Sequence, residues 1–213
     1  MKKFIFILVL LAVSFFVLWR FVFHKENKPK APEPVSMAVS EHSSDFNKSL
    51  AEMLTIYYQL TEAFVNWDTA GVIQHTASFK GSVDSLKLDE MKKDSAIYPT
   101  VESYWGMIRS EIDGMETDQD LYAKREDLNM LSQQVFDLLR IVKYDAATVY
   151  YHECPMALNN YETSAFWLSS QGSDDDRRNP YLGLHDPKYG KAMLKCGSTR
   201  DSVNFLVKTS TEQ

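Results

Sequence analysis

Apolar residues recur at intervals of three and four between Asp45 and Lys143, with polar residues between them. Such spacing gathers the apolar side chains on one face of a helix. It predicts four helices, over residues 46–67, 72–86, 101–115 and 121–142. Asp68 suits the N-cap of the second helix, and Pro99 suits the first turn of the third. Because short polar links join these segments, we expect an antiparallel four-helix bundle.

The pattern changes after Lys143. The segment ATVYYHECPMA, residues 147–157, is rich in aromatic and β-branched residues, which is typical of an extended chain. Pro155 disfavours a helix there. We therefore expect residues 148–197 to form a mostly irregular cap with one short strand, so that the fold class is mainly α. The polar run SDDDRRN, residues 173–179, predicts a solvated loop.

The N-terminus has the pattern of a membrane segment. Residues 4–18 carry no charge, residues 21–23 extend the apolar run, and Lys2 and Lys3 precede it. We find no small-x-small cleavage site and no lipoprotein cysteine there. The sequence favours a single retained anchor in the inner membrane with the body in the periplasm. The alternative is a cleaved signal peptide and a soluble periplasmic body.

The segment after the anchor, KENKPKAPEPVSM, holds three prolines and few apolar residues, which is typical of an extended linker. The expected organisation is therefore a membrane segment over residues 1–23, a linker over 24–44, a bundle domain with its cap over 45–200 and a tail over 201–213.

Charge is distributed unevenly along the chain. The net charge is -6, but the first thirty residues contain six basic residues and one acidic residue, which leaves 17 basic and 28 acidic residues in the remainder. An acidic body repels phosphate backbones, which argues against nucleic acid as a partner. The hydrophobic fraction of 45% is sufficient for a packed core.

Candidate chemistry begins in the extended segment, where His152, Cys154 and Met156 alternate. Side chains two residues apart on an extended chain share a face. An imidazole nitrogen, a thiolate and a thioether would therefore point in one direction, and such soft or borderline ligands favour Cu(I) or Ag(I) over Mg²⁺ or Ca²⁺.

The second cysteine has similar neighbours. Met193 and Cys196 are three residues apart, which places them on one face of a helical turn that Gly197 is suited to end, and His185 precedes them. If the two clusters meet, a copper site results. Its candidate ligands are Cys154, Met156, Met193, Cys196, His152 and His185.

Two other interpretations compete with the copper site. The only two cysteines of an exported chain most simply form a structural disulfide, Cys154 to Cys196. A thiol hydrolase using Cys154 and His152 is disfavoured, because no carboxylate or amide is evident to orient the histidine. We therefore expect no enzyme activity.

Several short motifs resemble those of a known family. They are CPMA (154–157), WLS (167–169), NPY (179–181) and MLKCG (193–197). Residues 123–143 are also similar to the helix that precedes CPMA in that family. This set resembles a bacterial domain of unknown function. That domain occurs in small exported proteins and at the C-terminus of CusB-type periplasmic adaptor subunits of heavy-metal efflux systems. The resemblance implies binding of copper or a related metal, with Cys154, Met156, Met193 and Cys196 as the positions involved.

Two functions follow from these patterns. The first is a membrane-anchored periplasmic protein that binds Cu(I) or Ag(I), as an accessory to heavy-metal efflux or copper homeostasis. The second is a disulfide-stapled helical interaction module that docks on a membrane transporter without binding metal. The sequence leaves both open.

Overall fold

The computed structural model of the protein describes residues 40–206. The expected membrane segment over residues 1–23 lies outside the described residues, as do most of the expected linker and the end of the expected tail. Within the described range, no helix combines the length and the apolar character that crossing a membrane requires.

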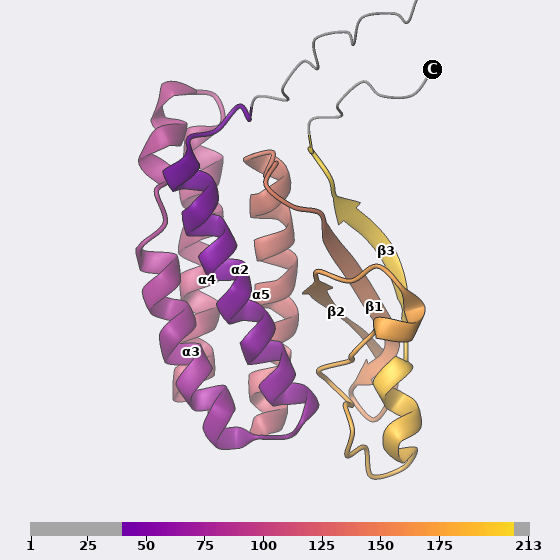
Figure 1. The fold of residues 1–213 in the computed structure, drawn as a ribbon. Helices are drawn as coiled ribbons and strands as arrows, with labels where there is room; N and C mark the ends of the chain where they lie inside the picture. Colours follow the sequence, from indigo (N-terminus) through magenta and orange to yellow (C-terminus); the bar gives the residue numbers. More distant parts are fainter. Residues whose placement is uncertain (1–39, 207–213) are drawn as a thin grey trace, which may run out of the picture. The chain divides into compact units, whose positions relative to one another are not determined.

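Four α-helices form the first part of the described chain. They are α2 (Ser44–Val65), α3 (Thr69–Asp84), α4 (Tyr98–Thr117) and α5 (Leu121–Ile141), with a 3₁₀ helix, η1 (Leu88–Lys93), between α3 and α4. Consecutive helices lie side by side in alternating directions (Figure 1). The four predicted helices are confirmed, with boundaries close to those that the apolar spacing gave.

Local signals fix where the helices begin. The side chains of Ser43, Asp68 and Asp120 accept hydrogen bonds from backbone N–H groups in the first turns of α2, α3 and α5. These bonds satisfy donors that lack partners within the helix. Asp68 is thus the N-cap that the sequence predicts, and Pro99 occupies the first turn of α4.

The apolar positions that predict the helices form the core. Many of their side chains are fully buried, among them Leu50, Tyr57, Phe64, Ile108 and Leu131. Burial of this apolar face, rather than helix propensity alone, stabilises helices of this length.

The C-terminal part contains more regular structure than the sequence predicts. Three antiparallel strands, β1 (Val149–Leu158), β2 (Thr163–Ser169) and β3 (Ser198–Val203), form a sheet in the order β2-β1-β3 (Figure 1). The expectation of a mostly irregular cap with one short strand is therefore wrong. β3 also continues past residue 200, into the segment expected as a tail.

Pro155 does mark an irregularity in β1. The register between β1 and β2 shifts between Cys154 and Leu158, which is where a residue without a backbone N–H can be accommodated in a strand.

Helix side chains cover the outer edge of β2. The backbone N–H of Phe166 donates to Oδ1 of Asn129 on α5 at 2.9 Å, and that of Leu168 donates to the hydroxyl of Tyr57 on α2 at 3.1 Å. The Tyr57 hydroxyl also lies 2.7 Å from that of Ser132. An open strand edge invites unwanted pairing with other chains, and here the bundle satisfies its donors instead.

Candidate functional site

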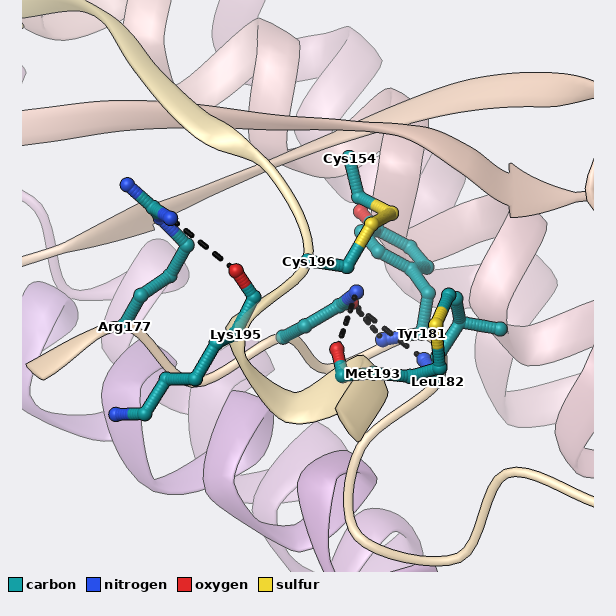
Figure 2. The surroundings of a disulfide bond; sticks show 8 residues. Cys154, Arg177, Tyr181, Leu182, Met193, Lys195 and Cys196 are labelled. Carbon is teal, nitrogen blue, oxygen red and sulfur yellow. Dashed lines mark hydrogen bonds between the residues drawn. A yellow bond between two sulfur atoms is a disulfide. The ribbon is translucent and has the colours of Figure 1, made fainter. Parts of the chain in front are cut away.

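The two cysteines meet on the face of the sheet that the segment after β2 covers. Cys154 on β1 and Cys196, just after the 3₁₀ helix η3 (Gly190–Lys195), form a disulfide with a Cα–Cα distance of 5.5 Å (Figure 2). That separation is usual for a disulfide. Cys154 is fully buried, whereas Cys196 is partly exposed. The disulfide alternative thus matches the structure, while the metal ligand set remains a prediction for the reduced chain.

Asn179 holds η3 in place beside the disulfide. Its backbone N–H donates to the Leu194 carbonyl at 3.0 Å, and its side-chain amide donates to the Met193 carbonyl at 3.3 Å. Its side-chain oxygen accepts from the N–H of Tyr181 at 2.9 Å (Figure 2). The asparagine is fully buried. It therefore joins the NPY and MLKCG motifs into one unit.

Most of the run at residues 173–179 is exposed, as the sequence predicts, but two of its residues are not. The side chain of Arg177 is buried and donates to the carbonyl of Lys195 at 3.2 Å, and Asn179 is buried as described. Ser173, the short 3₁₀ helix η2 (Asp174–Asp176) and Arg178 are exposed. The correction has a physical reason: backbone carbonyls of η3 provide partners for the polar groups that are buried against them.

Gly197 allows the chain to approach β1 closely after the disulfide. Its φ of 114° lies in a region that L side chains rarely adopt, and a Cβ there would overlap the carbonyl oxygen of Glu153. The expectation that Gly197 ends the turn after Met193 is therefore supported by its backbone conformation.

His152 shares a sheet face with Cys154 but is fully occupied by other contacts. Its ring is buried, with Nε2 2.7 Å from the Ser169 hydroxyl and Nδ1 3.1 Å from that of Thr199. Burial, with Arg177 nearby, lowers the pKa of His152 from 6.5 to about 4. The imidazole is therefore neutral at physiological pH, with both nitrogens partnered, and it has no free position for a metal.

The remaining candidate ligands are distributed unevenly. Met193 is buried and lies among the residues that surround the disulfide (Figure 2). Met156 is partly buried in β1, within the stretch where the register shifts. His185 is exposed, and its ring lies edge-on to that of Trp67 with centroids 6.4 Å apart. The structure therefore brings together Cys154, Cys196 and Met193.

Within residues 40–206, no group of three or more His, Cys, Asp or Glu side chains is arranged as a metal site.

Sequence reasoning missed Asn179 and Arg177 as organisers of this site. The NPY motif predicts a turn, and the charges of the DDDRR run indicate solvent exposure. Both side chains are buried because they donate to backbone carbonyls that lie later in the chain. Such contacts leave no local signal in the sequence.

Comparison with known proteins gives one family match. The model of a family described as "Protein of unknown function (DUF3347)" matches residues 53–146. This range covers the bundle from within α2 to just after α5 and ends before both cysteines. Searches of curated proteins and of solved structures matched none to this chain. The match therefore supports similarity to a domain of unknown function.

Proposed function

We propose that the described body is a disulfide-stapled helical interaction module of the bacterial cell envelope. The observation that carries this proposal is the disulfide between Cys154 and Cys196, which closes a loop across 42 residues and fastens η3 to β1. Disulfides persist in oxidising compartments and are rare in the cytosol. The apolar run at residues 4–23 is the proposed inner-membrane anchor, which leaves the body in the periplasm.

The proposed partner is a membrane transporter, with a heavy-metal efflux complex as the specific candidate. The support is the motif resemblance to the domain at the C-terminus of CusB-type adaptors, together with a sheet to which the disulfide fastens the η3 segment. A rigid module docks with little loss of conformational freedom. No catalytic step forms part of the proposal.

Thiol trapping in intact cells tests the staple. Full-length protein is quenched in acid and labelled with a large maleimide before and after reduction. We expect no label before reduction and two labels afterwards, because the only two cysteines are paired. The Cys154→Ser variant serves as the control, since it frees Cys196 for a single label without reduction. Two labels on the unreduced wild-type chain would refute the staple.

Soft-metal binding is the second candidate, confined to the reduced chain. Its support is the pairing of the two sulfurs and the presence of Met193 beside them (Figure 2). Reduction would provide two adjacent thiolates and a thioether, a set that suits Cu(I). The two histidines are not part of this revised set, because His152 is engaged by hydroxyl groups and His185 lies against Trp67.

Competition with a chromophoric Cu(I) chelator tests this candidate. We expect the reduced chain to remove copper from the chelator, the oxidised chain to remove none, and Met193→Leu to weaken uptake. Met130→Leu is the matched control, because Met130 is 47% exposed on α5. If the reduced wild-type chain leaves the chelator loaded, metal binding is excluded and the staple alone stands.

A further inference from the structure

Arg125 is a buried arginine that is not part of the cysteine site and has two guanidinium nitrogens without hydrogen-bond partners. Arg125, in the first turns of α5, is only 5% exposed, and neither its Nε nor its Nη2 has a hydrogen-bond partner. Its guanidinium carbon lies 4.3 Å from the centroid of the Trp67 ring. A cation–π contact of this kind supplies attraction to the guanidinium face but no acceptor for its N–H groups.

Another arginine of the same chain shows what these two nitrogens ordinarily bind. On Arg178, Nε donates to one carboxylate oxygen of Glu62 at 2.7 Å and Nη2 donates to the other at 2.6 Å. Two parallel N–H groups on one edge of a guanidinium match the two oxygens of a carboxylate. Arg125 carries the same edge without an acceptor.

Asp186, the carboxylate whose charge acts on Arg125, does not fill this role. Asp186 is buried, but its Oδ1 accepts the N–H groups of Lys188 and Tyr189 at 3.0 and 2.5 Å, and its Oδ2 accepts the Tyr161 hydroxyl at 2.9 Å. Asp186 therefore adds negative potential near Arg125 without a hydrogen bond to it. Burial lowers the pKa of Arg125 from 12.5 to about 10, so the cation is retained at neutral pH although its donors are unsatisfied.

A cavity of about 150 Å³ adjoins Arg125. Its walls include the aromatic rings of Trp67, Tyr122 and Tyr181, together with Leu158. An apolar cavity of roughly this volume accommodates one benzene ring. Asn160 and Asp186 also line it. The cavity thus combines room for a small apolar body with one cationic group, whose Nε and Nη2 lack partners, and one carboxylate, whose oxygens already accept hydrogen bonds.

The turn between β1 and β2 forms another wall and has an unusual backbone. Asn159, Asn160 and Tyr161 have φ values of 48°, 54° and 73°. Asparagine tolerates this left-handed region, but for a tyrosine it is strained. Strain of this kind is retained where the surrounding structure requires it, commonly at ligand sites. Here it places Tyr161 in the cavity wall, with its hydroxyl bonded to Asp186.

We propose that this cavity binds a small carboxylate whose body is about the size of one benzene ring, with the carboxylate on the Nε and Nη2 edge of Arg125. Two oxygens satisfy both unpartnered donors, and the aromatic walls enclose the apolar part. A phosphate carries a further oxygen, which would be buried against apolar walls at a cost in free energy. It therefore fits this cavity less well. A free metabolite and the C-terminal carboxylate of a peptide share this chemistry.

Calorimetric titration of the full-length chain with benzoate tests the proposal. We expect one saturable site for benzoate, no comparable binding of neutral benzamide, and an affinity loss of about tenfold or more in Arg125→Gln. Arg109→Gln is the matched control, because Arg109 also lies over a tryptophan, Trp105, at 4.8 Å but is partly exposed and paired with Asp84. A short peptide with a free or amidated C-terminal phenylalanine, titrated in parallel, distinguishes the two sources.

Two results would overturn the inference. The first is absence of saturable binding of both benzoate and the free-carboxylate peptide to the wild-type chain. The second is unchanged affinity in Arg125→Gln. If the glutamine variant folds poorly, thermal unfolding of ligand-free Arg125→Met provides a second test. A cation held for a ligand is unfavourable without it, so this variant should unfold at the same or a higher temperature. A marked fall would show that Arg125 is structural.

Discussion

Reduction of the disulfide should remove a large share of the stability of this domain. The bond between Cys154 and Cys196 spans a sequence separation of 42 residues. Restricting the unfolded chain over a loop of that length stabilises the folded state by about 4 kcal/mol in the chain-entropy model. Small domains are commonly stable by about 5–15 kcal/mol, so the loss is substantial. With a urea dependence of about 2 kcal/mol per molar, the unfolding midpoint should fall by roughly 2 M.

The assay is urea unfolding followed by circular dichroism, with and without a phosphine reductant. The double variant Cys154→Ala/Cys196→Ala is the control: it should unfold near the midpoint of the reduced wild-type chain and should not respond to reductant. A shift below about 1 kcal/mol on reduction of the wild-type chain would contradict the reasoning. It would mean that the loop is already restricted in the unfolded state or that the bond does not form.

Two further predictions concern residues beside the disulfide. The pKa of His152 is 6.5 in the unfolded chain and about 4 in the folded chain. As pH drops, His152 therefore binds a proton in the unfolded chain before it does so in the folded chain. The free energy of unfolding should therefore decrease by up to about 3 kcal/mol as pH drops from 6.5 to 4, and not further below. Urea unfolding of His152→Gln across this range should lack that component, and an identical pH profile would contradict the assignment. Gly197→Ala should destabilise the chain by at least about 2 kcal/mol, because it combines a positive φ with overlap on the Glu153 carbonyl. Gly81→Ala, which meets open space within α3, should instead raise the unfolding temperature slightly; equal effects of the two substitutions would refute the steric argument.

The bundle was predictable because its signals are local. The three-four spacing of apolar residues, the N-cap at Asp68 and the proline at the start of α4 all lie within the helices that they specify. Burial of those apolar faces then follows from packing one helix on the next. Boundaries predicted in this way agree closely with the structure.

The sheet was less predictable because its pairing is not local. β3 has the sequence STRDSV, in which only Val203 is fully buried and apolar, so it lacks the alternation of a half-buried strand. Its partner residues on β1 lie 45 to 54 residues earlier, as the register of Glu153 with Ser198 and of Val149 with Val203 shows. The burial of Arg125 could not be predicted for the same reason. A helical pattern assigns this residue to a solvated face. Its burial depends on a loop that packs on α5 from far along the chain.

The disulfide and the carboxylate cavity share one segment, and this connection makes a final prediction. The loop closed by Cys154 and Cys196 contains both the strained turn and the 181–187 segment that wall the cavity. That segment is also fastened to the end of α2, where the N–H of Leu184 donates to the Val65 carbonyl at 3.1 Å and Gly183 approaches too closely for any side chain. Reduction removes one of these two fastenings. We therefore expect benzoate affinity to fall several-fold in the reduced chain under conditions where it remains folded, because the cavity walls must then be ordered on binding. The titration is repeated with reductant and with Cys154→Ala/Cys196→Ala. Equal affinity in all three samples would show that the contact at α2 is sufficient to hold the cavity, and that the redox state of the cysteines does not influence it.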